Sequence, residues 1–180
     1  MIDPRTVVRH LLGLTRTLQD VDDLEAQLKA ITDATLALLP GEHASIRLLD
    51  ESRTELLCGA RSGAGEDHKP VPFQPGEGIV GWVIEHGELV RLADVCDDER
   101  FAERPQQGFA VRSLLALPLH AGHDVIGMLA TVSSESDVFT DEHETLGQLL
   151  ANCAIPPIER TRLKRLALMD DHTSAFNRRY

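Results

Sequence analysis

The sequence contains few cysteines and no long apolar run. Its three cysteines, Cys58, Cys96 and Cys153, are widely separated and form no Cys-x-x-Cys pair, which argues against a disulfide framework and a zinc ribbon. No stretch approaches the roughly 18 consecutive apolar residues that a membrane-spanning helix needs. The opening Met1-Ile-Asp-Pro also lacks the charged and then apolar pattern of a secretory signal. We therefore expect a cytoplasmic protein with reduced, mostly buried thiols.

Positive charge is also scarce. The 180 residues include 18 Lys and Arg against 29 Asp and Glu, for a net charge of −11. Such a surface repels nucleic acids and anionic membranes, so neither is expected as a partner. Six of the basic side chains lie between Arg160 and Arg179, where we expect them to solvate a linker helix. The length suits one domain with appendages.

The spacing of apolar residues predicts two helices at the start of the chain. Val7, Leu11, Leu14 and Leu18 recur at helical spacing. A second stripe covers residues 24–39 and ends at a Pro-Gly pair. From residue 44 the period changes to two, which predicts strands. The expected strands cover residues 45–50, 54–61, 89–93, 112–119 and 125–132, with 71–73 as a candidate short strand.

Two further helices complete the predicted order of elements. A short helix over residues 79–86 should end at Gly87, and a longer one should cover residues 141–154. The order predicts an α+β fold. We expect an antiparallel β-sheet of about five to six strands, with helices packed on one face and a cap of loop and short helix on the other.

Three blocks of sequence stand out in the second half of the predicted order of elements. They are Pro75-Gly-Glu-Gly-Ile-Val-Gly-Trp-Val83, Val90-Arg-Leu-Ala-Asp-Val-Cys-Asp-Asp-Glu-Arg-Phe101, and Val111-Arg-Ser-Leu-Leu-Ala-Leu-Pro-Leu119 followed by Val125-Ile-Gly-Met-Leu129. These blocks resemble those of a GAF domain, a cytoplasmic sensory module. The blocks occur in the family's order, and the resemblance covers residues 20–155.

The resemblance implies a ligand pocket between the sheet and the segment with the short helices, where family members bind cyclic nucleotides, bilins, haem or small metabolites. One fold carries many unrelated sites, so the ligand and any cofactor stay unknown. The same apolar residues are also what a core requires. Mapped onto this chain, the candidate pocket residues are Ile46, Leu48, Cys58, Ile79, Val80, Val83, Phe101, Phe109 and Arg112.

Known ligand signatures of the family are missing. The segment Val138-Phe-Thr-Asp-Glu-His143 lacks the Asn and Lys of the cyclic-nucleotide motif, and no Cys adjoins a His as in bilin attachment. Cys96 alone cannot supply both thiols of a methionine sulfoxide reductase. His120 and His123 have no third ligand nearby for a metal. We therefore expect no metal site, no catalytic residue and no turnover from this chain.

The C-terminal segment carries a set of polar residues at fixed spacing: Asp170, Thr173, Asn177, Arg178 and Arg179. They match the pattern Leu-x-x-x-Asp-x-Leu-Thr-Gly-Leu-x-Asn-Arg-Arg, so the segment resembles the opening of a GGDEF domain, the diguanylate cyclase family. The expected organisation is an N-terminal helix (1–19), a GAF domain (20–155), a linker helix (156–169) and a truncated GGDEF start (170–180).

Two hypotheses about function follow from these resemblances. In the first, the chain senses a small molecule and controls a C-terminal cyclase through a dimeric linker helix. In the second, it is a dimerisation or protein-interaction module with an empty pocket. An enzyme in its own right is a third, weaker alternative. We expect a homodimer formed through the outer faces of the first helix and of helix 141–154.

A proline pair interrupts the predicted output helix. Pro156 and Pro157 cannot donate to the carbonyls of Asn152 and Cys153, and each would cost about 3 kcal/mol inside a helix. We therefore predict that one helix ends near residue 154 or 155. A second helix should start near Pro157, where a missing N–H costs nothing.

Overall fold

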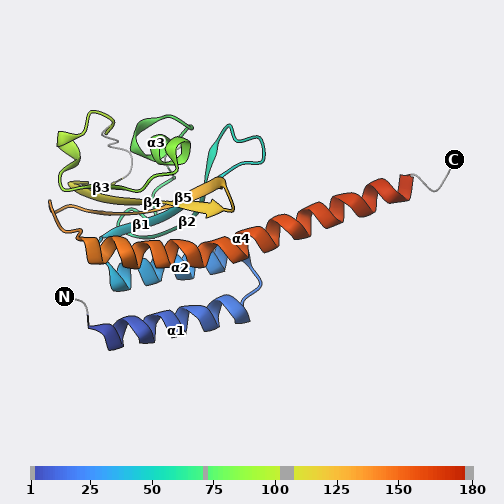
Figure 1. Cartoon of the computed structure of the whole chain (residues 1–180), viewed down its shortest axis with the longest axis horizontal. Coiled ribbons are helices and arrows are strands. Elements are labelled where there is room, and N and C mark those ends of the chain that lie inside the picture. Colours follow the sequence, from blue (N-terminus) through green and yellow to red (C-terminus); the bar gives the residue numbers. More distant parts are fainter. Residues whose placement is uncertain (1–2, 71–72, 102–107, 177–180) are drawn as a thin grey trace.

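A five-stranded antiparallel sheet lies between a layer of helices and a smaller cap (Figure 1). The computed structural model describes residues 3–70, 73–101 and 108–176, with side chains of the last helix as far as Leu166. The strand order is β2-β1-β5-β4-β3, which confirms the predicted α+β fold. The strands are β1 (His43–Leu49), β2 (Leu56–Gly63), β3 (Val90–Leu92), β4 (Ser113–Ala121) and β5 (Asp124–Ser133). Of the candidate strand 71–73, only Phe73 is described, and it forms an isolated bridge with Leu56.

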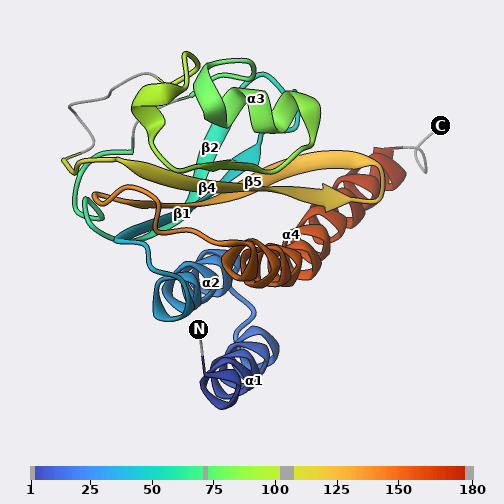
Figure 2. The same cartoon turned by 60° about the vertical axis from the view of Figure 1, so that its left-hand side comes forward.

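Both faces of the sheet are covered. Helices α2 (Leu24–Leu38) and α4 (Asp141–Phe176) pack on one face, and α1 (Pro4–Asp20) lies on their far side (Figure 2). The cap on the other face contains α3 (Gly78–His86) and the short 3-10 helix η1 (Val95–Asp97). The sheet therefore separates two apolar cores, one against the helices and one against the cap.

Local sequence explains where the helices begin and end. Asp3 caps α1 by accepting hydrogen bonds from the N–H groups of the two residues after Pro4, and Asp23 caps α2 by accepting from the N–H of Ala26 at 2.9 Å. Gly87 ends α3 in the left-handed conformation, with φ of 67°. His120 of the β4–β5 hairpin fixes this end, since its Nε2 lies 3.0 Å from the carbonyl oxygen of Gly87.

Strand β1 alternates between the two cores. Ile46 belongs to the helix-side core, whereas His43, Ser45 and Arg47 lie on the cap side. The pairing of β1 with β5 is regular from His43 to Leu48, so successive side chains point to opposite faces. All residues from His43 to Arg47 are buried.

Helix α4 is unbroken through Pro156 and Pro157, so the predicted break and the separate linker helix are wrong. Packing on both sides of the proline pair offsets the two missing hydrogen bonds. Before the pair, Ala154 is fully buried in the helix-side core, and Ile158 packs against the same core after it. In the part of the chain that is described, no helix is long and apolar enough to cross a membrane.

Ion pairs hold the continuation of α4 against the turn between α1 and α2. Lys164 Nζ donates to both carboxylate oxygens of Asp22, at 2.8 and 2.9 Å. Arg160 lies 3.7 Å from the same carboxylate. These contacts are exposed and individually weak, and they lie where α4 leaves the domain (Figure 1).

Replacing Pro156 by alanine should stabilise the protein. Pro156 is exposed, so the substitution restores an N–H donor to the carbonyl of Asn152 and removes a ring clash without loss of packing. We expect the free energy of unfolding to rise by about 1–3 kcal/mol, after the greater freedom of the unfolded chain is subtracted. Denaturant unfolding measures it. Pro4→Ala is the control, because Pro4 begins α1 and should give no gain. An equal or lower stability for Pro156→Ala would contradict the explanation.

Candidate ligand-binding site

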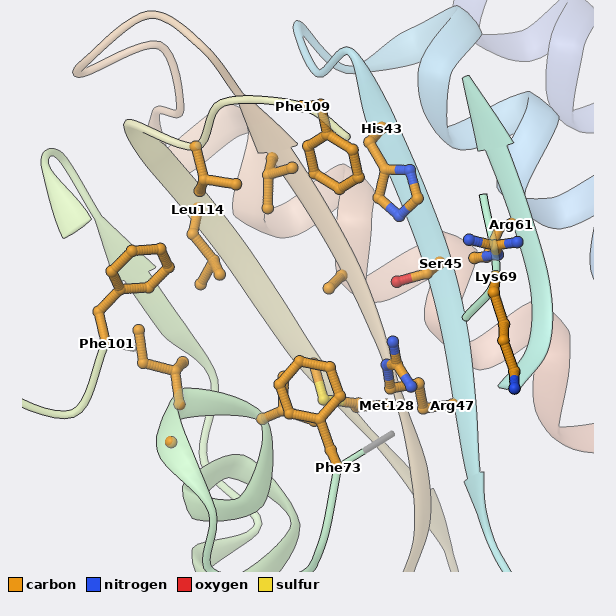
Figure 3. Close-up of a pocket in the computed structure, with 16 residues that line it drawn as sticks. His43, Ser45, Arg47, Arg61, Lys69, Phe73, Phe101, Phe109, Leu114 and Met128 are labelled. Atoms are coloured by element: carbon orange, nitrogen blue, oxygen red, sulfur yellow. The ribbon is translucent and has the colours of Figure 1, made fainter. Parts of the chain in front are cut away.

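A cavity of about 100 Å³ lies between the sheet and the cap. Figure 3 shows it bounded by β1 on one side and by Phe73, Phe101 and Phe109 on the others. Residues from β4 and β5, among them Leu114 and Met128, form its floor. The pocket thus occupies the place that the GAF resemblance implies.

Four of the nine predicted pocket residues line this cavity. They are Ile79, Val80, Phe101 and Phe109. Val83, one turn further along α3, is fully buried in the same cap-side core and is absent from the lining among the described residues.

Ile46 and Leu48 do not face the pocket, because they lie on the opposite face of β1. Both pack in the helix-side core. Alternate side chains of a strand point to opposite faces of the sheet. A prediction that is shifted by one residue therefore selects the side chains of the opposite face. The residues that do face the pocket are His43, Ser45 and Arg47.

Cys58 and Arg112 also lie away from the pocket. Cys58 of β2 lines a shallow groove beside α2, together with Glu25 and Lys29. The Arg112 guanidinium forms an ion pair with Asp94 and is half exposed. Its Nε donates to the Asp94 carboxylate at 3.1 Å.

Sequence reasoning missed the three polar residues on β1. Arg47 is only 8% exposed, and its guanidinium carbon lies 4.3 Å from the centre of the Phe73 ring, within the range of a cation–π contact. The available signal was three polar residues at alternate positions, two of them in the predicted strand 45–50 and His43 just before it. Selecting apolar residues for the pocket passed over it.

His43 is held as a neutral ring. Its Nδ1 lies 2.6 Å from the carbonyl oxygen of Ala64, and the ring stacks on Phe109 with centroids 4.4 Å apart. Burial lowers the pKa of His43 from 6.5 to about 4. A carbonyl oxygen can only accept, so Nδ1 carries the proton and Nε2 keeps its lone pair.

The pocket is positively charged although the chain is acidic. The described lining residues include the cations Arg47, Arg61 and Lys69, and no carboxylate. Arg61 also orders the loop after β2, donating to the carbonyls of Gly65 at 3.2 Å, Glu66 at 2.9 Å and His68 at 2.5 Å. Lys69 is exposed. Low-dielectric walls concentrate such a field, which favours an anionic occupant.

Metal and thiol chemistry find little support in the structure. Within the described residues, no three His, Cys, Asp or Glu side chains are grouped so as to hold a metal ion. Cys96 is exposed, and its hydrogen bond to Asp94 raises the pKa of the thiol, which reduces the fraction present as reactive thiolate. The absence of turnover stays a prediction.

His43 should make the protein less stable at mildly acidic pH. Its pKa is about 4 when folded and near 6.5 when unfolded. Between these values only the unfolded state takes up the proton, so stability is full above pH 6.5 and falls below it. We expect the free energy of unfolding to drop by about 2 kcal/mol between pH 7 and pH 4.5. Denaturant unfolding of His43→Asn should show a shallower fall, with a remainder from His143, whose pKa burial also lowers. An unchanged slope would refute the assignment.

A family model for GAF domains matches residues 21–154. The chain is 35% identical over 86 residues to the dual 3',5'-cyclic-AMP and -GMP phosphodiesterase 11A of Takifugu rubripes, which covers 44% of this chain and 10% of that protein. It is 29% identical over 144 residues to the Nif-specific regulatory protein of Azotobacter vinelandii, which covers 76% of this chain and 26% of that protein. The chain thus spans a tenth to about a quarter of the length of these curated relatives.

The fold also matches solved structures. The GAF domain of a phosphoenolpyruvate-protein phosphotransferase from Coxiella burnetii superposes with a TM-score of 0.81 at 24% identity, covering 90% of this chain and 98% of that one. The family model covers well over half of the chain, and the five-stranded sheet with its capped pocket has the matching architecture. The chain belongs to the GAF domain family.

Proposed function

We propose that the chain is the sensory part of a signalling protein, which binds a small molecule in the pocket and passes the change to an output domain along α4. The observation that carries the proposal is the position of pocket and helix on opposite faces of the same strands. Leu114 and Met128 line the pocket, and their neighbours Leu115 and Leu129 lie in the helix-side core. Any shift of β4 or β5 on ligand binding therefore reaches the helix layer directly.

The contact between β4 and α4 leaves little space. A Cβ atom added at Gly147 of α4 would lie 2.8 Å from Leu117 Cδ1 and 3.4 Å from Leu115 Cδ2. Packed cores transmit small displacements because they have few voids to absorb them. The helix that rests on β4 at this point is also the one that leaves the domain.

The names of the relatives support a role in signalling, since one is a regulatory protein and another acts on cyclic nucleotides. For the output we propose a GGDEF domain. Its expected first residues include Asp170 and Thr173 on α4, whereas Asn177, Arg178 and Arg179 lie outside the described residues. A longer form of the chain that makes no cyclic dinucleotide would overturn this assignment.

An exposed apolar surface on α1 and α4 supports homodimerisation. Val8, Leu12 and Leu149 are 56%, 55% and 45% exposed. Val8 and Leu149 line a groove between the two helices, together with Leu89. Exposed apolar side chains continue along α4 at Leu163 and Leu166. A second copy packed in parallel could therefore cover α4 both at Leu149 and at these two residues. The same surface favours the alternative of an interaction module with an empty pocket.

A bound small molecule decides between these two functions. We expect native mass spectrometry of the purified protein to show a non-covalent ligand that is released on denaturation. Ala130 lines the pocket, so Ala130→Leu should fill part of the cavity and abolish the adduct. Ala110→Leu adds the same atoms at an exposed position and should retain it. Protein that carries no molecule under any growth condition would favour the interaction module.

The dimer is tested by light scattering at high micromolar concentration. We expect a mass of two chains for the unchanged protein and of one chain for Leu149→Glu, because a charge in a desolvated apolar interface is costly. Leu57→Glu is the matched control, since Leu57 is 52% exposed on strand β2. A mass of one chain for the unchanged protein would contradict the proposed homodimer.

A further inference from the structure

Two polar side chains of the pocket each present one unpaired polar atom to the cavity. His43 and Ser45 are each 7% exposed. Within the described residues, no hydrogen-bond partner reaches His43 Nε2 or the Ser45 hydroxyl, whereas His43 Nδ1 is held by Ala64. Both residues line the cavity, and neither atom is among the fully enclosed, unpaired polar atoms of the described residues. A molecule in the cavity can therefore reach both atoms and pair with them.

The chemistry of each atom says what the ligand must present. His43 Nε2 is a pure acceptor in the neutral ring, so it requires a donor from the ligand. The Ser45 hydroxyl can donate or accept. The Arg47 guanidinium carries five N–H donors and no acceptor, and its planar edge suits a carboxylate.

The three side chains are arranged in a row. Figure 3 shows His43, Ser45 and Arg47 one after another on the same side of β1. The row therefore offers an acceptor at one end, a hydroxyl in the middle and a cation at the other end. A ligand that complements it has a donor group at one end and an anionic group at the other.

Charge and size narrow the donor group and the length of the ligand. An ammonium donor would enter a pocket that already holds Arg47, Arg61 and Lys69, so a neutral hydroxyl fits better. The cavity of about 100 Å³ is smaller than the roughly 150 Å³ that accommodates benzene. The occupant has only a handful of non-hydrogen atoms, fewer than a nucleotide or a tetrapyrrole.

We propose that the ligand is a short hydroxycarboxylate, with its carboxylate on Arg47 and Ser45 and its hydroxyl donating to His43 Nε2. The inference rests on the proposed sensory function and names the class of molecule that the pocket recognises. Phe73, Phe109 and Met128 enclose the short carbon chain.

Matched pairs of acids test the proposal by calorimetric titration at pH 7.5. The hydroxy acids glycolate, lactate and 3-hydroxybutyrate are compared with acetate, propionate and butyrate, and lactamide serves as the uncharged probe. We expect at least one hydroxy acid to bind about tenfold more tightly than its partner, because the partner leaves Nε2 unpaired. Lactamide should bind at least tenfold more weakly than lactate, because it lacks the charge.

Variants assign each end of the ligand. His43→Asn keeps a donor for the Ala64 carbonyl but has no atom at the position of Nε2, so the hydroxyl preference should fall to about one. Arg47→Gln should abolish binding of every acid. Ser45→Ala changes no charge and should weaken binding several-fold, which keeps the test open if Arg47→Gln does not fold. Arg112→Gln is the control outside the pocket and should bind normally.

The outcomes separate this inference from the sensory function. The hydroxycarboxylate proposal would be overturned by equal affinity for paired acids, by tight binding of lactamide, or by a co-purified ligand that is a nucleotide or an amino acid. The proposed sensory function would remain in each of these cases. If no probe binds and native mass spectrometry finds no adduct, both proposals fall.

Discussion

The structure depends on a sheet that is buried on both faces. Strand β1 contributes Ile46 to the helix-side core and Ser45 to the pocket, with no exposed residue between His43 and Arg47. The polar residues of this strand, from His43 to Arg47, therefore face the pocket and its contents, where their polar atoms can find partners. The cap of α3 and its flanking loops creates this arrangement, because it covers the face that most antiparallel sheets leave in water.

Charge inside the cap-side core is stabilised by several weak contacts. Arg47 lies over the ring of Phe73, and Arg61 is held by backbone carbonyls of the loop that follows β2. His43 avoids the cost by remaining neutral. The pocket therefore contains a neutral His43 ring, which can accept a hydrogen bond, and the cation Arg47. Both face the same small cavity, although the chain as a whole carries a net charge of −11.

The sequence predicted most of the fold and part of the pocket. Periodicity placed the four α-helices and the strand pairs, since each is a property of neighbouring residues. Periodicity could not show whether the odd-numbered or the even-numbered residues of β1 face the cap. Ser45 and Ile46 are both buried, and only the packed sheet distinguishes them. The proline pair misled the prediction for a similar reason. Local propensity requires a break at Pro156, but Ile158 and Asp22 hold the next turns of α4 in place, and such contacts join residues far apart in the sequence.

The unbroken α4 is long enough to amplify a small tilt. The helix has 36 residues, and the distance from Gly147, where it rests on β4, to its last described residue is about 44 Å at 1.5 Å per residue. For a rod of that length, a tilt of about 5° at Gly147 moves the far end sideways by about 4 Å, which is roughly half of the 8–10 Å that separates the axes of packed helices. In the proposed dimer, a displacement too small to disturb the packing of the sheet would therefore be large enough, at the far end, to change which side chains of the two α4 helices meet.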